Sequence, residues 1–332
     1  MTAIRRTVDN VTGADGIDGL RRIGASYADQ LTDIDLQLLW AEGGRDGRRG
    51  QGDRGDRGGQ GHGAHGVGSP SRAAALLRHD PETIPALLDR PSVFDAIFGE
   101  QAVIAGRPLL VSPFLIFAVA VHRARHDLTS MRHVAERIGL RQKVPVFDAP
   151  QLAEFLDSAP RRLFLAELLV SFTRSSDRYR VHTERGWRWR RLNELDPLRL
   201  AGLLTATAAE ERPGIYRRLG DTVLFLAGVF PDYTQDRALS PVDAARLVRT
   251  AGIAADGDDP ERMATAPAME LFEHLGACWY RNAWQTSRHR TRQLEVVADV
   301  AERFHQARRV LNLITDRYLF PISTNPGGAP AR

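Results

Sequence analysis

The order of apolar and polar positions predicts a mainly helical protein. Apolar residues recur at the three- and four-residue spacing of a helix face over most of the chain. Capping residues precede prolines at the start of several predicted helices. There the cap side chain accepts a hydrogen bond from a free backbone N–H, and proline has no N–H that needs an acceptor. These pairs are Ser112-Pro113, Asp196-Pro197 and Ser240-Pro241, with Asp148 in the same role before Pro150. We therefore expect a multi-helix, bundle-like domain of about ten helices.

The predicted helices differ in length. The first spans 20–41, and Pro91 separates two short helices between 81 and 98. The two longest come last, at 267–287 and 291–318. The apolar face of the first helix is formed by Leu31, Ile34, Leu38 and Leu39. That of the last helix is formed by Val297, Val300, Ala301, Phe304, Ala307, Leu311, Ile314 and Tyr318. Such stripes predict helices that lie on a hydrophobic core.

Residues 178–190 are an exception, because they alternate with the period of a β-strand. Polar and apolar positions alternate up to Thr183, and the alternation resumes at Trp187 after the tripeptide 184–186. We expect a β-hairpin that turns at Gly186. On this interpretation one face is apolar and aromatic, with Tyr179, Val181, Thr183, Trp187 and Trp189. The other face is basic, with Arg178, Arg180, His182, Arg188 and Arg190.

A glycine-rich segment interrupts the helical pattern. Between Gly43 and Gly68, 12 of 26 residues are glycine, and the apolar residues are limited to Ala64 and Val67. Burial cannot offset the ordering entropy of such a segment, so we expect 43–72 to be a disordered insertion. The predicted organisation is an N-terminal segment 1–42 that packs on the main body, this insertion, a helical body and a tail. The body spans 73–320 with a possible subdivision near 141–150, and the disordered tail spans 321–332.

Composition adds a strong preference for arginine. The chain has 332 residues and 45 basic side chains, of which only Lys143 is lysine. The formal net charge is +4, yet 174–192 alone carries +5 and 43–72 carries +3. Subtracting both from the total leaves −4 for the rest of the chain. The sequence therefore predicts a mildly acidic helical body with two basic segments.

Several protein classes are excluded or disfavoured by composition. Cys278 is the only cysteine, so the chain cannot form an internal disulfide or a zinc site built from several cysteines. The longest apolar run, 114–121, is far shorter than the roughly 20 residues that a membrane-spanning helix needs. Residues 1–18 contain no apolar core of signal-peptide length. We expect a cytoplasmic protein without a membrane-spanning segment.

The basic side of the predicted hairpin is the main candidate for ligand binding. Arginine binds phosphate oxygens with a bidentate fork, and several arginines on one face would bind a polyanion. The candidate anion-binding residues are Arg178, Arg180, His182, Arg188 and Arg190. A solvated outer face with arginines paired to nearby acids is the alternative. A second basic run, 288–292, lies between the two last predicted helices, where a solvated loop is the favoured interpretation.

Two other groups of polar residues are candidate sites. His122 and His126 lie four residues apart on one predicted helix, a spacing that can ligate a metal, although we expect no metal and no cofactor. Asp221 lies among apolar residues of another predicted helix, and if buried it needs a partner such as Arg217 or Arg218. It is either a pocket carboxylate or, as we favour, part of an ion pair that joins helices.

The C-terminal third resembles part of a known group of proteins. The segment 216–232, YRRLGDTVLFLAGVFPD, resembles a segment that recurs in a family of uncharacterised, mainly helical bacterial proteins. The stretch 297–312 is similar to the segment that accompanies it. The resemblance implies one helical unit and carries no activity.

These observations favour a non-enzymatic, soluble helical interaction or scaffold protein with an unknown protein partner. The alternative is binding of nucleic acid or another polyanion through the arginine-rich hairpin. A helical enzyme, with a site assembled from residues far apart in the sequence, is a third possibility. Membrane binding is not expected.

Overall fold

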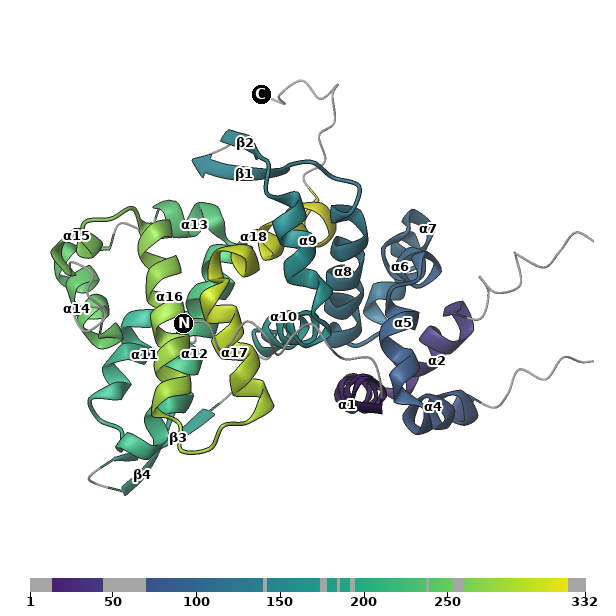
Figure 1. The fold of residues 1–332 in the computed structure, drawn as a ribbon, viewed down its shortest axis with the longest axis horizontal. Coiled ribbons are helices and arrows are strands. Elements are labelled where there is room, and N and C mark those ends of the chain that lie inside the picture. Colours follow the sequence, from purple (N-terminus) through teal and green to yellow (C-terminus); the bar gives the residue numbers. More distant parts are fainter. Residues whose placement is uncertain are drawn as a thin grey trace, which may run out of the picture. The chain divides into compact units, whose positions relative to one another are not determined.

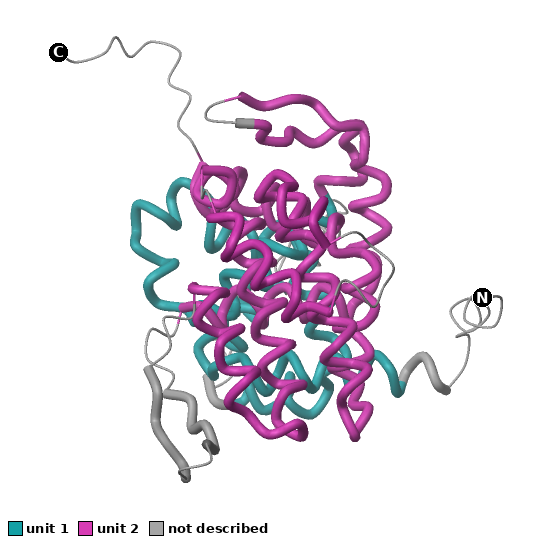
Figure 2. The backbone as a smooth tube through the Cα atoms, turned by 90° about the vertical axis from the view of Figure 1, so that its left-hand side faces the viewer, with its two compact units in different colours: residues 1–126 teal, residues 127–332 magenta. Residues whose placement is uncertain are grey.

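Helices make up most of the computed structural model (Figure 1). The structure describes residues 14–43, 70–139, 142–173, 178–183, 186–191, 195–236, 239–252 and 260–321. The chain divides into two compact units, Met1–His126 and Asp127–Arg332 (Figure 2). The boundary falls within one helix, α8, whereas the sequence suggested a subdivision near 141–150.

Unit 1 is built from short helices. Its α-helices are α1 (Ala14–Gln30), α2 (Asp33–Gly43), α4 (Pro70–His79), α5 (Ile84–Leu88), α6 (Pro91–Phe98), α7 (Glu100–Ile104) and most of α8 (Pro113–Leu128). Two 3₁₀ turns, η1 (Pro81–Thr83) and η2 (Arg107–Leu109), join them. Pro91 separates α5 from α6 as predicted. Buried side chains of α1, α2, α5 and α6 form the core, among them Tyr27, Leu36, Leu39, Ile84 and Ile97.

Unit 2 contains the longest helices and all the strands. The strands are β1 (Val134–Gly139), β2 (Gln142–Val146), β3 (Arg178–Thr183) and β4 (Gly186–Arg191). The helices are α9 (Ala149–Asp157), α10 (Ala159–Ser171), α11 (Pro197–Leu204), α12 (Arg212–Val229), α13 (Pro231–Asp236), α14 (Pro241–Ala251), α15 (Pro260–Ala264), α16 (Ala268–Thr286), α17 (Arg292–Glu302) and α18 (Phe304–Ile314). A 3₁₀ turn, η3 (Ala209–Glu211), precedes α12, and a π-helical turn, η5 (Thr315–Leu319), follows α18.

The predicted fold class, mainly α with a small β-hairpin, is confirmed. The described residues form more helices than the ten or so expected, because several are only five or six residues long. A second antiparallel hairpin, β1–β2, was not predicted. Its strands combine Glu136, Arg137 and Lys143 with few large apolar residues, so their alternation is weak. The side chains that hold this hairpin come from α13, α18 and the π-turn.

Three of the four predicted helix caps are confirmed. Ser112 accepts from the Leu115 N–H, Ser240 from the Asp243 N–H, and Asp196 from the first turn of α11. Asp148 precedes α9 as expected but makes no capping hydrogen bond. Its carboxylate is instead bound by Arg309, so a tertiary ion pair has replaced the local cap.

The first predicted helix is two helices, and the single helix expected at 20–41 is wrong. A reciprocal capping box starts α2, since Thr32 Oγ1 accepts from the Asp35 N–H while Asp35 accepts from the Thr32 N–H at 2.8 Å. The other oxygen of the buried Asp35 accepts from the Ser112 N–H at 2.9 Å. The break changes the helix faces, and Ile34 of the predicted stripe is exposed.

The last predicted helix is also interrupted. Arg303 leaves helical geometry, with φ −124° and ψ 32°, and separates α17 from α18. The predicted stripe nevertheless stays buried on both sides of the break. Phe304, the first residue of α18, packs against Tyr280 with ring centroids 5.7 Å apart. The break redirects the chain while the same apolar residues face the core.

The β3–β4 hairpin has a different register from the one expected. Thr183 pairs with Gly186, so two residues separate the strands, whereas the predicted turn had three. A one-residue change of register moves every position of one strand to the opposite face of the ribbon. The side chains of the five basic candidates lie outside what the structure describes, so their shared face stays a prediction. Arg180 lies opposite Trp189, and Arg188 lies opposite Val181.

The predicted insertion and tail lie largely outside the described residues. Gly43 and residues 70–72, which we had assigned to the insertion, belong to α2 and α4 because both helices pack in unit 1. Arg90 donates to the Gly43 carbonyl and fixes that end of α2. Among the helices that the structure describes, none is long and apolar enough to cross a membrane.

The pairing of α12 with α16 forms the centre of unit 2. Gly220 of α12 faces the ring of Tyr280 on α16, and Gly276 of α16 faces Phe304 and Val223. A Cβ at either position would overlap these side chains. The two helices therefore approach closely because each has a glycine where the other places a ring or a branched side chain.

Replacing Gly220 with alanine tests this close approach. The added methyl group would overlap the Tyr280 ring, and overpacking of this kind costs about 1–3 kcal/mol. We expect a lower Tm for Gly220→Ala by thermal denaturation. Gly214→Ala in the same helix is the control, since a Cβ there meets no neighbouring atom and alanine favours the helix. Equal Tm changes in the two variants would contradict the proposed packing.

Candidate functional site

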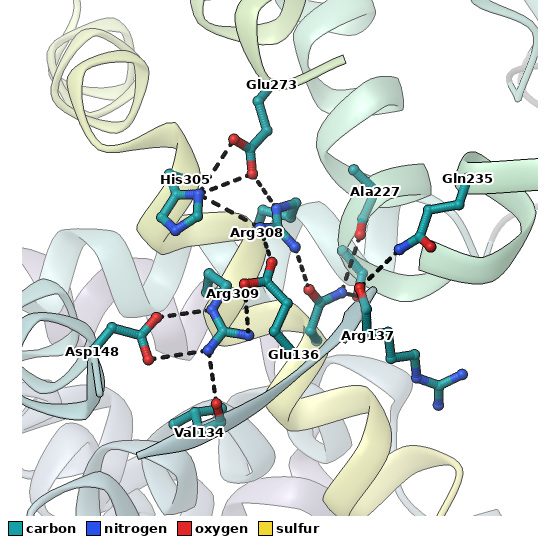
Figure 3. Close-up of polar contacts among 12 residues, drawn as sticks. Val134, Glu136, Arg137, Asp148, Ala227, Gln235, Glu273, His305, Arg308 and Arg309 are labelled. Carbon is teal, nitrogen blue, oxygen red and sulfur yellow. Dashed lines mark hydrogen bonds and ion pairs between the residues drawn. The ribbon is translucent and has the colours of Figure 1, made fainter. Parts of the chain in front are cut away.

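Two consecutive arginines of α18 organise a buried polar cluster in unit 2 (Figure 3). The side chain of Arg309 is fully buried. Its Nε and Nη2 donate to the two carboxylate oxygens of Asp148 at 2.8 and 3.0 Å. Nη1 and Nη2 also donate to the carbonyls of Ala135 and Val134 at 3.1 and 3.0 Å. Arg309 thereby joins α18 to the start of α9 and to the backbone of β1.

Arg308 makes a second set of contacts on another side of α18. Its Nη2 lies 2.6 Å from Glu136 of β1, and its Nε donates to Glu273 of α16. Its Nη1 donates to the Asn312 side chain at 2.8 Å. The Asn312 amide in turn donates to the Ala227 and Gly228 carbonyls near the end of α12. Arg308 therefore connects three elements through carboxylates and one amide.

The ionisation of Glu273 depends on these cations. Burial disfavours its charged form, but the hydrogen bond from His305 and the charge of Arg308 outweigh burial. The pKa of Glu273 is consequently held below its ordinary value. The His305 Nδ1 lies 3.1 Å from Glu273, and its ring is half-exposed.

A third arginine, Arg137 of β1, lies between Asp232 of α13 and Asp316 of the π-turn. Lys143 of β2 also binds Asp316, with Nζ 2.7 Å from the carboxylate. Burial opposes ionisation of Asp316, but Arg137 and Lys143 outweigh it and lower its pKa. The Arg137 carbonyl accepts from Gln235 at 2.9 Å. Together with Arg308 and Arg309, these contacts form an ionic clamp that holds the β1–β2 hairpin on the helices.

The clamp is a structural site. Its cations and carboxylates bind one another, and its arginines are largely buried. Sequence analysis did not predict it, because its members come from β1, β2, α9, α13, α16 and α18. One signal in the sequence could have indicated the clamp. Arg308 and Arg309 are adjacent charged residues that lie between apolar residues of the last predicted helix.

The structure brings Asp221 to the interface predicted for it. Its side chain is buried, and Arg217 of the same helix lies 3.9 Å away, as one of the two expected partners. The nearer contact, which the sequence did not indicate, is the Tyr280 hydroxyl, which donates to Asp221 at 2.8 Å. Burial raises the pKa of Asp221, although Arg217 and the Tyr280 hydrogen bond oppose the effect. The same burial raises the pKa of Tyr280 well above its usual value.

The predicted histidine pair is not brought together as a metal site. His122 is buried in unit 1, where Nδ1 lies 2.7 Å from Asp89 and Nε2 lies 3.1 Å from the Tyr27 hydroxyl. His126, one turn later on α8, is exposed. Within the described parts of the chain, no group of three or more His, Cys, Asp or Glu is arranged to hold a metal ion. His122 thus belongs to a Tyr–His–Asp chain, buried at Tyr27 and His122 and exposed at Asp89, that joins α1, α8 and the end of α5.

The second basic run borders a shallow hollow. The hollow has a volume of about 340 Å³ and is lined by Ala209, Glu210, Arg212, Tyr216, Thr286 and Arg288. Arg288 lies 2.8 Å from Glu210 across it, and both side chains are largely exposed. This surface ion pair agrees with the solvated-loop interpretation of the basic run.

Unit 1 carries a concentrated group of exposed aliphatic side chains. Val103 and Ile104 on α7 are 56% and 79% exposed, and Leu109 and Leu110 at η2 are 89% and 68% exposed. Gly106, with φ +67°, makes the turn that joins α7 to η2. We call these four side chains the 103–110 patch. In the sequence these four residues look like other apolar residues, and only the structure shows that they are exposed and not part of the core.

Comparisons with known proteins give no further guide to the site. No family model, no curated protein and no solved structure matches this chain. The function must therefore be argued from its own surfaces.

Opposite pKa shifts at the buried Asp221 and the partly buried Glu273 lead to a pH-dependence test. The raised pKa of Asp221 means that its contribution to stability is greatest at low pH and is lost as the pH rises. The lowered pKa of Glu273 means that its contribution is present above about 4.5 and is lost at lower pH. As the pH rises from 4 to 7, the Tm of Asp221→Asn should therefore increase relative to that of the unmodified protein. Over the same interval the Tm of Glu273→Gln should decrease relative to that of the unmodified protein. Parallel Tm–pH curves for the two variants would contradict the assigned directions.

Proposed function

We propose that this chain is a non-enzymatic helical interaction protein that self-associates through the 103–110 patch. The observation that carries this proposal is the exposure of four large aliphatic side chains within eight residues. Contiguous exposed apolar patches larger than a few hundred Å² are rare on soluble monomers, and such patches mark interaction surfaces. Water contact with these side chains is unfavourable, and a second protein surface would remove it.

A second copy of this chain is the partner that the patch suits. The patch has two halves, Val103 and Ile104 on α7 and Leu109 and Leu110 at η2. In a two-fold symmetric contact, the α7 half of one copy can face the η2 half of the second copy, and the reverse. Apolar atoms then contact apolar atoms in both halves of the interface. Arg107, between the halves, has its guanidinium 3.8 Å from Glu42, which partly balances its charge.

The size of the patch sets the expected affinity. Two copies of four aliphatic side chains would bury an area of about 1,000 Å², at the small end of specific interfaces. Weak self-association with a Kd on the order of 10 µM is the expected result. The association should depend little on salt, because the patch itself is uncharged.

Sedimentation equilibrium of the full chain tests the proposal. We expect a concentration-dependent dimer, and a monomer for Leu109→Asp combined with Leu110→Asp. The control is Val242→Asp, which places a charge at an exposed valine of α14 outside the patch. A protein that stays monomeric at 100 µM contradicts the proposal, as does equal loss of dimer in the control. Patch-dependent co-sedimentation with phosphatidylcholine–phosphatidylglycerol vesicles would replace it with membrane binding.

A second proposal, binding of a polyanion through β3–β4, is favoured by the presence of both strands at the predicted place. Residues 174–192 carry seven arginines against one Asp and one Glu. Basic segments of this density bind phosphate backbones through ionic contacts.

Salt dependence tests the second proposal. Affinity for DNA or RNA should fall steeply as salt rises, because phosphate contacts release counterions. Replacing Arg178, Arg180, Arg188 and Arg190 together with alanine should abolish binding in a filter or anisotropy assay. Unchanged affinity of this variant, with thermal stability retained, would exclude the hairpin as the polyanion site.

A further inference from the structure

The hollow at the start of α12 combines three kinds of side chain. Its wall contains the aromatic ring of Tyr216, the carboxylate of Glu210, and the guanidinium groups of Arg212 and Arg288. These residues belong to η3, to the first turns of α12 and to the loop that joins α16 to α17 (Figure 1). With a volume of about 340 Å³, the hollow has the size of a small binding site for an organic molecule.

Arg212 is held in place by the backbone. Its Nε donates to the Thr207 carbonyl at 3.2 Å, which fixes the plane of the guanidinium. Within the part of the chain that the structure describes, Arg212 forms no ion pair, and its two terminal nitrogens have no protein acceptor. A guanidinium that is oriented in this way offers a fork of N–H donors to an anion in the hollow.

Arg288 and Glu210 form an ion pair across the hollow that leaves both groups with unused capacity. The Arg288 Nη2 lies 2.8 Å from the Glu210 Oε1, and the two side chains are 73% and 54% exposed. This contact occupies one nitrogen and one oxygen. The other N–H groups of Arg288 and the second oxygen of Glu210 are therefore available to a ligand.

The positive charge continues along the loop beyond the hollow. Arg290 and Arg292 are exposed, and the Arg290 guanidinium stacks on the Trp284 ring, 4.7 Å from its centroid. Stacking uses a face of the guanidinium, so the donors in its plane remain free for phosphate oxygens. Among the described residues, no carboxylate pairs with either arginine. Their charge is therefore not neutralised as it is in the clamp.

A nucleotide has the three chemical parts that these side chains recognise. An aromatic ring binds a base by stacking, and a carboxylate accepts hydrogen bonds from ribose hydroxyls. Arginine forks bind the phosphate oxygens. A bare phosphate would leave Tyr216 without a contact, and the charge of Glu210 would repel it. The combination of an aromatic ring and a carboxylate with cations favours a ligand that has more than phosphate.

We propose that the hollow binds a nucleoside polyphosphate, with its base against Tyr216 and its first phosphate between Arg212 and Arg288. The further phosphates then lie along Arg290 and Arg292. The site shares no residue with the 103–110 patch or with the segment 174–192. Nucleotide binding is therefore an activity separate from self-association and from polyanion binding through β3–β4.

Isothermal titration calorimetry of the full chain with ATP, AMP and tripolyphosphate tests the site. We expect ATP to bind more tightly than AMP, which has fewer phosphates, and more tightly than tripolyphosphate, which has no base. Arg212→Ala should weaken ATP binding by about tenfold or more, because it removes charge-assisted hydrogen bonds. The matched control is Arg249→Ala, since Arg249 is an exposed arginine of α14 outside the hollow, and its ATP affinity should be unchanged.

Two further variants separate the parts of the ligand. Arg290→Ala combined with Arg292→Ala should reduce the ATP affinity to that of AMP and leave AMP binding unchanged. Tyr216→Ala should weaken ATP and AMP binding and leave tripolyphosphate binding unchanged. Tyr216→Phe keeps the ring and should bind ATP as the unmodified protein does, which excludes a general loss of the fold as the cause.

The contradicting outcomes are distinct from those of the two proposals above. No detectable heat with ATP at millimolar concentration overturns nucleotide binding. Tripolyphosphate binding as tight as that of ATP overturns the contact with the base, as does an unchanged Tyr216→Ala. ATP binding that is lost in the Arg178, Arg180, Arg188 and Arg190 variant but kept in Arg212→Ala overturns the hollow as the site and leaves polyanion binding through β3–β4 intact.

Discussion

The burial of two adjacent guanidinium groups on α18 is the constraint on which unit 2 depends. Neighbouring residues on a helix point about 100° apart, so Arg308 and Arg309 contact different sides of their surroundings. Removing a guanidinium from water costs several kcal/mol unless carboxylates and carbonyls replace the lost hydration. Asp148, Glu136 and Glu273 must therefore lie where the arginines reach them. This requirement fixes β1, the start of α9 and one turn of α16 around α18.

The clamp also gives the arginine-rich composition a structural meaning. Arg309 bonds both oxygens of Asp148 and two carbonyls of β1 through three nitrogen atoms. A lysine ammonium, with its donors on a single nitrogen, cannot span such a set. The one lysine of the chain, Lys143, occurs where a single contact to Asp316 suffices. The geometry of each site therefore decides where lysine could replace arginine.

The parts of the fold that the sequence predicted depend on near neighbours in the chain. Ser112, Asp196 and Ser240 act as caps because their acceptors and donors lie within three residues. The stripe of the last helix stays buried even across the break at Arg303, since burial depends on side-chain type more than on helix continuity. The capping box of Thr32 and Asp35 was also readable and would have divided the first predicted helix.

The parts that were not predicted depend on contacts between residues far apart in the sequence, or on a one-residue difference in the register of paired strands. Asp148 has the sequence of a helix cap, yet Arg309, 161 residues later, binds it instead. His122 has the spacing of a metal ligand, yet Asp89 and Tyr27 occupy its two nitrogens. In the hairpin, alternation along each strand was evident, but which positions share a face depends on whether two or three residues separate the strands. Local patterns cannot decide among such alternatives, because several tertiary arrangements satisfy them equally well.

The clamp and the segment 174–192 show that one residue type occurs in two different charge environments within unit 2. Around α18, each of Arg137, Arg308 and Arg309 lies beside at least one carboxylate, so the local charges balance and the arginines add rigidity. In 174–192, seven arginines are accompanied by two acids, and pairing within the segment can neutralise only two of them. The remaining charge produces a field that extends over roughly 8–10 Å at physiological salt. The ratio of arginine to carboxylate within a segment, more than the number of arginines in the chain, therefore separates a structural cluster from a candidate anion-binding surface.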